Sequence, residues 1–104
     1  MKNSIQNLDQ FHNDLHVNSE LFHTLLKQKN IHIELIESCS VKNGELYNQN
    51  HDEWVLLLNG KAILELNGKP ITLKSGDFFL IGKKVPHRVL FTSKRTRWLA
   101  IHTI

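Results

Sequence analysis

The chain has 104 residues, of which 40% are hydrophobic, 8% aromatic and 22% charged, and its formal net charge is +3 at pH 7. This length predicts one domain, which buries roughly two thirds of the surface of its unfolded chain without covalent cross-links. The single Cys39 excludes an intramolecular disulfide, and no apolar stretch approaches the roughly 20 residues needed to cross a bilayer. Because the N-terminus lacks the apolar segment of a signal peptide, we expect a cytoplasmic protein with no membrane partner.

Residues 1–30 predict an N-terminal helical arm that packs on the rest of the domain. The stretch "SELFHTLLKQK" has an N-cap candidate at its start, lysines at its end and apolar residues at helical spacing, namely Leu21, Phe22, Leu25 and Leu26. The residues before it carry apolar side chains less regularly, which is typical of a second short helix or of an irregular arm.

From Ile31 to the end of the chain, the pattern changes to that of β-strands. In "IHIELIES" the apolar side chains of Ile31, Ile33 and Leu35 alternate with His32 and Glu34. The remaining sequence predicts seven or eight short strands at close spacing, which is typical of an all-β sandwich or barrel over residues 31–104.

Two Asn-Gly pairs predict tight turns within this β-region. Asn59-Gly60 and Asn67-Gly68 bracket the stretch "KAILEL", and Asn-Gly favours two-residue hairpins because both turn residues take positive φ. We therefore expect an antiparallel meander, with its strands at residues 53–58, 61–66 and 70–74.

Three polar residues lie on apolar strand faces. Alternation places Glu53 with Val55 and Leu57, and His87 with Val89 and Phe91. Because burying an unpaired carboxylate is costly unless it is hydrogen-bonded or binds a metal, this pattern indicates a site. His102 shares a face with Trp98 and Ala100, so it either lines the same cavity as an acid or base or is a histidine of the core or rim.

The spacing of these residues resembles the two sequence motifs of the cupin superfamily. In the first motif, Glu53 and Gly60 are spaced as the family requires, but Tyr47 and Gln49 stand at its paired histidine positions. In the second, Gly76 and His87 match, whereas Gly82, Lys84 and Phe91 replace Pro, Gly and Asn. From Phe22 to His102 the chain is also similar to small single-domain cupins. The resemblance implies a single antiparallel β-barrel of jelly-roll type.

The resemblance also implies a metal site inside the barrel. By position, Gln49, Glu53 and His87 would be the ligands, with Tyr47 at the remaining place and His51 as a possible replacement. Glu and His are good ligands for Zn, Fe, Mn or Ni, whereas the oxygens of Gln and Tyr are weak ones. Such a small cupin would be a metal-dependent enzyme, in which the ion polarises a carbonyl or activates water or dioxygen. Lys84 and Arg88 at the mouth would attract an acidic small molecule.

Two alternatives remain open at this stage. In one, the barrel is metal-free and binds a small, sugar-like ligand through Tyr47, Gln49 and Glu53. In the other, it is a structural or regulatory domain that dimerises through an exposed β-face and its tryptophans. In every case we expect a homodimer, which is the commonest soluble oligomer. Basic residues cluster near the C-terminus, but no nucleic-acid-binding motif accompanies them, so we do not expect a nucleic-acid partner.

Overall fold

The computed structural model describes residues 4–104, and these are almost entirely β-structure. Residues 1–3 of the expected arm lie outside the described residues. The elements in chain order are η1 (Leu8–Gln10), β1 (Ser19–Gln28), β2 (Ile31–Cys39), β3 (Asp52–Asn59), β4 (Lys61–Leu66), β5 (Lys69–Lys74), β6 (Phe78–Ile81), β7 (His87–Thr92) and β8 (Thr96–Thr103). No helix in residues 4–104 has the length and apolarity needed to span a membrane.

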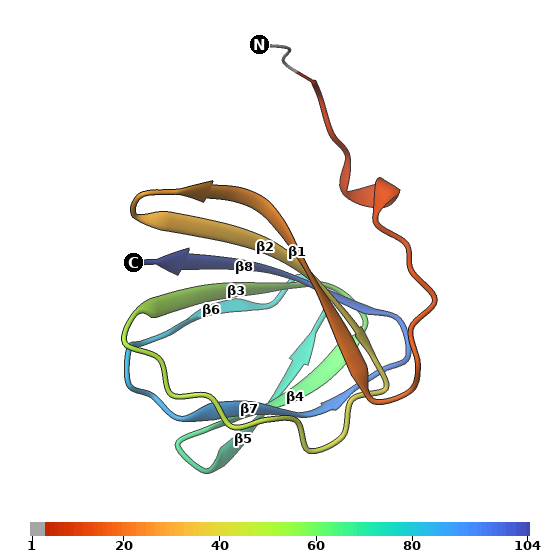
Figure 1. The fold of residues 1–104 in the computed structure, drawn as a ribbon. Helices are drawn as coiled ribbons and strands as arrows, with labels where there is room; N and C mark the ends of the chain where they lie inside the picture. The colour runs from red at the N-terminus through yellow and green to blue at the C-terminus, as the bar shows by residue number, and fades with distance from the viewer. Residues whose placement is uncertain (1–3) are drawn as a thin grey trace.

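The strands form two antiparallel sheets that face each other (Figure 1). One sheet has five strands in the order β1-β2-β8-β3-β6, and the other has three in the order β5-β4-β7. Buried residues from both sheets meet between them, among them Val55, Leu57, Leu64, Ile81, Trp98 and Ala100. The all-β prediction is confirmed, and the core lies where the alternation of β3 and β8 places it.

The two sheets do not close into the barrel that the resemblance implies. The chain between β2 and β3 follows the edge of β7 as a loop, joined to that strand by two isolated bridges, Lys42–Phe91 and Tyr47–His87, and by separate backbone hydrogen bonds. Because this segment is not a continuous strand, no hydrogen-bonded ladder joins the two sheets within residues 4–104.

The prediction of a helix at residues 19–29 is wrong, since Ser19–Gln28 form strand β1 and pair with β2. The register shifts between Thr24 and Leu26, so that Leu25 is an extra residue in the strand. This bulge moves Leu26 to the same side of the sheet as Leu21, which gives a strand the uneven apolar spacing of a helix. Tertiary pairing overrides the local helical preference here.

The arm before β1 contains one 3-10 turn and no α-helix among its described residues. It crosses the side of the five-stranded sheet that faces away from the core. The Asn13 amide nitrogen Nδ2 donates to Glu37 Oε1 at 2.6 Å, and Arg97 Nη1 donates to the Leu8 carbonyl at 3.1 Å. The rings of Phe11 and His23 lie 4.7 Å apart. These contacts hold the arm against β2 and β8.

Only one of the two Asn-Gly pairs forms a hairpin. Asn67 (φ 50°) and Gly68 (φ 78°) connect the paired strands β4 and β5, as predicted. The pair Asn59-Gly60 instead connects β3 in one sheet to β4 in the other, so the predicted meander is wrong at this point. Gly60 takes a φ of 94°, and a Cβ atom there would lie 2.6 Å from Ser93 Oγ and from Thr96 Oγ1. The dipeptide marks a tight turn correctly but does not determine which strands pair.

Candidate functional site

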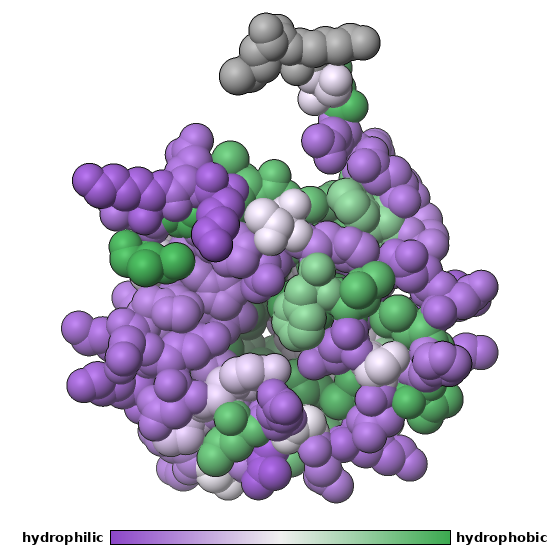
Figure 2. All heavy atoms as spheres, in the orientation of Figure 1, coloured by the Kyte–Doolittle hydropathy of each residue, from purple (hydrophilic) through white to green (hydrophobic). Residues whose placement is uncertain are grey.

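A cavity of about 220 Å³ lies between the two sheets. Figure 2 shows the surface hollowed near its middle, with polar and apolar side chains around the hollow. Six of the eight side chains expected at the site line this cavity, namely Tyr47, Gln49, Glu53, His87, Arg88 and His102. The other two, His51 and Lys84, are not part of its lining.

Glu53 and His87 face each other across the cavity from different sheets. Glu53 is buried near the start of β3, His87 is buried at the start of β7, and Glu53 Oε1 lies 3.7 Å from His87 Nε2. The Val85 carbonyl lies 2.9 Å from His87 Nδ1, so this nitrogen carries a proton and donates it to the carbonyl. In the neutral ring, Nε2 therefore keeps a free lone pair that points toward Glu53.

The pKa of His87 is raised above its ordinary value, although burial by itself would lower it. The Glu53 carboxylate and the Val85 carbonyl both favour the imidazolium, and together they outweigh the burial. The His87 ring therefore keeps its second proton over a wider pH range than an ordinary imidazole does.

Gln49 and Tyr47 lie on the loop that precedes β3. The side-chain oxygen Oε1 of Gln49 is buried and has no hydrogen-bond partner. The Gln49 carbonyl accepts a bond from the Lys84 backbone nitrogen at 2.6 Å, and Tyr47 exchanges two backbone bonds with His87, at 2.8 and 2.9 Å. These bonds fix the loop along β7, so Gln49 is held as part of the cavity lining, with its side-chain oxygen buried.

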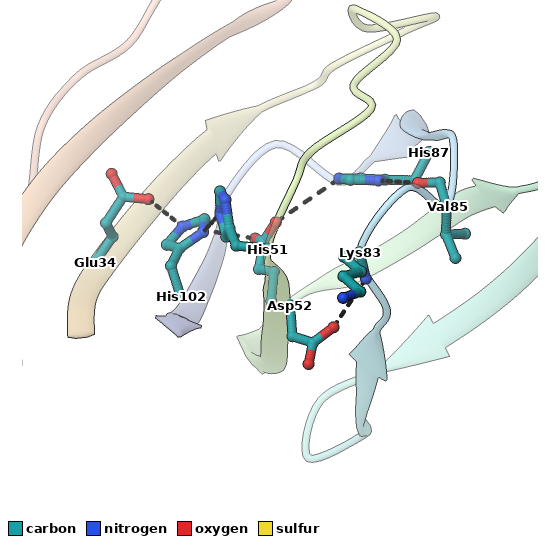
Figure 3. A network of polar contacts seen from close by, with 8 residues as sticks. Glu34, His51, Asp52, Lys83, Val85, His87 and His102 are labelled. Atoms are coloured by element: carbon teal, nitrogen blue, oxygen red, sulfur yellow. Dashed lines mark hydrogen bonds and ion pairs between the residues drawn. The ribbon is translucent and has the colours of Figure 1, made fainter. Parts of the chain in front are cut away.

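His102 is the centre of a second polar group, drawn in Figure 3. Its Nε2 lies 2.8 Å from Glu34 Oε1, and its Nδ1 lies 2.9 Å from His51 Nε2. The hydrogen bond to Glu34 raises the pKa of His102 above its ordinary value, although burial opposes the shift. Glu53 Oε2 lies 4.0 Å from His102 Nε2, and this contact connects the group to the Glu53–His87 pair. His51 thus supports His102 from outside the cavity.

The two cations expected at the mouth differ in position. Arg88 lines the cavity, and its Nε donates to Glu65 Oε1 at 3.1 Å. Lys84 is exposed, with a positive φ of 61°, and lies in the turn before β7. Arg88 is therefore the only cationic side chain of the expected set that reaches the cavity.

Two carboxylates of the cavity wall, Glu20 and Glu34, were not predicted from the sequence. Glu20 lies on β1 and accepts a hydrogen bond from Ser38 Oγ at 2.5 Å, and burial raises its pKa above the usual value. The hydrogen bond from His102, by contrast, lowers the pKa of Glu34 despite its burial. Glu34 alternates with apolar residues, as Glu53 does, but Glu20 was hidden in the segment predicted to be a helix.

The donor atoms at the cavity fit a divalent cation with a small number of protein ligands. Within residues 4–104, no three His, Cys, Asp or Glu side chains are grouped closely enough to hold a metal. However, the 3.7 Å between Glu53 Oε1 and His87 Nε2 is less than the sum of two metal–ligand bonds of roughly 2.1 Å each, so both atoms can bind one ion. Gln49, whose side-chain oxygen has no hydrogen-bond partner, lines the same cavity and would add a third, neutral donor.

The chain matches the family model described as "Cupin domain" over residues 39–102. No curated protein matches it. It is similar to a protein of known structure from Ralstonia eutropha JMP134, named a "putative mannose-6-phosphate isomerase", at 34% identity and a TM-score of 0.75, over 86% of this chain and 91% of that one.

Two further solved structures show the same fold at lower identity. A cupin superfamily protein from Desulfitobacterium hafniense DCB-2 is 22% identical, with a TM-score of 0.70 over 88% of this chain and 83% of that one. An RmlC-like cupin from Shewanella frigidimarina is 13% identical, with a TM-score of 0.78 over 98% of this chain and 91% of that one. With the family model matching more than half of its length, this chain belongs to the cupin family.

Proposed function

We propose that this cupin binds a divalent metal ion (Zn, Fe, Mn or Ni) and a small polar molecule in the cavity between its sheets. Glu53, His87 and Gln49 are the proposed metal ligands. The observation that carries the proposal is the buried, unpaired Oε1 atom of Gln49, which lines the same cavity as the Glu53–His87 pair. A buried acceptor without a partner costs free energy, and a bound cation or hydrogen-bond donor would remove this cost.

All three proposed ligands offer a lone pair when the His87 ring is neutral. Glu53 is a carboxylate, Gln49 presents its carbonyl oxygen, and the neutral His87 ring presents Nε2 because its Nδ1 donates to Val85. Atoms that offer lone pairs bind a species that accepts them, such as a metal cation. A metal ion bound there would supply a Lewis acid that polarises an oxygen of the ligand. The hydrogen bond that His87 Nδ1 donates to the Val85 carbonyl would hold the ring in the orientation for binding.

The second molecule is proposed to be rich in hydroxyl groups. Glu20 and Glu34 add two carboxylates to the wall, and hydroxyl groups can donate hydrogen bonds to them. An acidic substituent on the ligand would lie toward Arg88. The Ralstonia protein carries the name of an isomerase that acts on a phosphorylated sugar, and this name agrees with a sugar-like ligand.

A metal-free ligand site is the second candidate. It is favoured by Tyr47 and Gln49, which stand where metal-binding cupins have histidines, and by the lack of a three-residue group of strong ligands within residues 4–104. In this case Glu53, Gln49 and His87 would bind hydroxyl groups directly.

Metal content separates the two candidates. The untagged protein is purified, its metals are measured by elemental analysis, and its melting temperature is followed while Zn²⁺, Mn²⁺, Fe²⁺ or Ni²⁺ is added. We expect a bound or stabilising metal in the wild type, its loss in Glu53→Gln and His87→Ala, and tighter binding in Gln49→His, which places a strong ligand beside the other two. His12→Ala, at an exposed histidine outside this cavity, is the matched control and should bind as the wild type does.

If none of the metals binds or stabilises the wild type, the metal proposal fails. A melting screen of sugars and sugar phosphates in the presence of a chelator then tests the metal-free site. Stabilisation that disappears in Glu53→Gln would support that site, and no stabilisation by any compound would reject it.

A further inference from the structure

The cavity wall has more acidic side chains than lysines or arginines, whereas the whole chain has a formal net charge of +3. Its three carboxylates are Glu20, Glu34 and Glu53, and Arg88 is the one lysine or arginine among the described residues that line it. A cavity walled by charges of one sign attracts ions of the opposite sign. The kind of ligand that the cavity attracts therefore depends on which of these charges the protein itself balances.

Glu20 is the charge that the protein leaves unbalanced. Glu34 and Glu53 each lie beside a histidine, so that a protonated ring is taken up by its own carboxylate, and Arg88 pairs with Glu65. Within residues 4–104, Glu20 forms no ion pair. A cation that enters the cavity thus finds one carboxylate without a competing positive charge.

The contacts of Glu20 orient its carboxylate and leave one of its oxygens open. Trp98 Nε1 donates to Ser38 Oγ at 3.2 Å, and Ser38 Oγ donates to Glu20 Oε2 at 2.5 Å. The other oxygen, Oε1, accepts no hydrogen bond within the described residues and is not fully buried, so a donor can reach it. Burial raises the pKa of Glu20, and the bond from Ser38 offsets only part of this effect, as expected for a carboxylate without a counter-charge.

Two exposed aromatic rings lie beside Glu20 in the cavity lining. Phe22 follows two residues further along β1, on the same side of the strand, and is 48% exposed. Tyr47 lines the cavity from the loop before β3 and is 38% exposed. Burial, followed by the carboxylates of Glu45 and Glu20, raises the pKa of Tyr47, so Glu20 is close enough to act on this phenol. The faces of such rings attract ammonium groups.

Glu20 is too distant from the Glu53–His87 pair to bind the same metal ion. Through β2, Glu20 is level with Thr96 of β8, whereas Glu53 pairs with His102 of that strand. At a rise of about 3.3 Å per residue, the stretch of β8 between these two levels is much longer than two metal–ligand bonds of roughly 2.1 Å each. A cation at Glu20 is therefore distinct from the proposed metal.

We propose that Glu20, Phe22 and Tyr47 form a subsite for a protonated primary amino group of the cavity's ligand, which is then a small hydroxylated amine such as an amino sugar. The ammonium group would donate to Glu20 Oε1 and pack against the two rings. A second metal ion fits this subsite less well, because the rings supply no good metal ligand. The inference rests on the proposed binding of a small polar molecule in this cavity, but it does not require the metal.

Chemical-shift titrations of the isotope-labelled protein at pH 7 test the proposal with two matched pairs of probes. The members of each pair differ by an amino group in place of a hydroxyl group: glucosamine with glucose, and 3-aminopropanol with 1,3-propanediol. We expect the amines to bind about tenfold more tightly than their counterparts, the gain from one hydrogen bond to a charged group. Glu20→Gln, which is neutral but can still accept from Ser38, should lose this preference. Asp14→Asn, at an exposed residue outside this cavity, should keep it.

A preference in at least one pair that depends on Glu20 supports the proposal. Equal affinities within both pairs overturn it, and so does a preference that persists in Glu20→Gln. If this variant does not fold, the wild type decides: the amines must shift the signals of β1 around Glu20 and Phe22, and shifts confined to other elements overturn the proposal. Metal binding that depends on Glu53 and His87, without a preference for amines, removes this inference alone. If no metal and no sugar binds, the proposed function fails as well.

Discussion

Glu34 and His102 are neighbours on β2 and β8, and their side chains are joined by a hydrogen bond of 2.8 Å between Oε1 and Nε2. This bond holds the pKa of Glu34 below its usual value of 4.5, against the effect of burial, and raises the pKa of His102 above its usual 6.5. Both groups are therefore charged together over a range that includes mildly acidic pH.

The pair should stabilise the fold most strongly between pH 4.5 and 6.5. The contribution of Glu34 is present above its unfolded pKa and is lost as the pH falls through its lowered folded value. The contribution of His102 is present below its unfolded pKa and is lost as the pH rises through its raised folded value. Urea unfolding of wild type and Glu34→Gln across this range measures the difference, which should shrink on either side. A difference that does not depend on pH would show that the pair is not ionised.

Replacing Gln49 should separate stability from binding. Its Oε1 atom is buried and unpaired, so Gln49→Leu removes a polar atom that gains no hydrogen bond in the ligand-free protein. We expect the ligand-free melting temperature to stay equal or rise, and the stabilisation by metal or sugar to be lost. Differential scanning calorimetry with and without ligand provides both values. In Gln28→Leu, at an exposed residue at the end of β1, ligand stabilisation should be unchanged.

The two turn glycines should differ in their tolerance of a side chain. Both have positive φ, which costs roughly 1–2 kcal/mol for an L-residue with a Cβ. At Gly68 the added Cβ has no atom within 4 Å, so Gly68→Ala should lose only about this amount. At Gly60 the Cβ would lie 2.6 Å from two hydroxyl oxygens, so Gly60→Ala should lose clearly more. Chemical denaturation compares the free energies of unfolding, and equal losses would contradict the tight turn at Gly60.

Glu37 should control the attachment of the arm. Its carboxylate accepts from the Asn13 backbone nitrogen at 3.1 Å and from the Asn13 side chain at 2.6 Å, and it lies 2.6 Å from His23 Nε2. Glu37→Ala removes these bonds, each to a charged acceptor and worth about 1.5 kcal/mol, and the loss of one such bond already corresponds to about tenfold faster exchange of the Asn13 amide. Hydrogen exchange followed by mass spectrometry measures this change. Glu65→Ala, which removes only the partner of Arg88, should leave the arm unaffected.

The strands with regular alternation were the predictable part of this fold. Glu53 with Val55 and Leu57 on β3 follows a period of two without interruption, so their common face was correctly predicted. On β7 the same rule fails, because consecutive residues Ile63 and Leu64 pair with Phe91 and Val89. The extra residue between Val89 and Phe91 turns the Phe91 side chain away from the cavity, and Phe91 is 40% exposed.

It was harder to predict from the sequence which side of a strand faces the cavity. In β2 the residues Ile33 and Leu35 do share one apolar face, which is the outer side of the sheet, whereas Glu34 and Ile36 line the cavity. Both sides of this strand are apolar, so alternation identifies two faces without distinguishing them. The meeting of Glu53 with His87 was nevertheless predictable from their spacing to the two glycines of the family motifs.

The Glu53–His87 pair also has a consequence for the way this protein unfolds. One partner belongs to the five-stranded sheet and the other to the three-stranded sheet, and no continuous ladder ties those sheets together in residues 4–104. A metal ion or ligand bound by both side chains would therefore link the two sheets. The single cysteine of the chain cannot form an intramolecular disulfide that would do the same. The free energy of unfolding would then increase with the fraction of molecules whose cavity holds this ion or ligand.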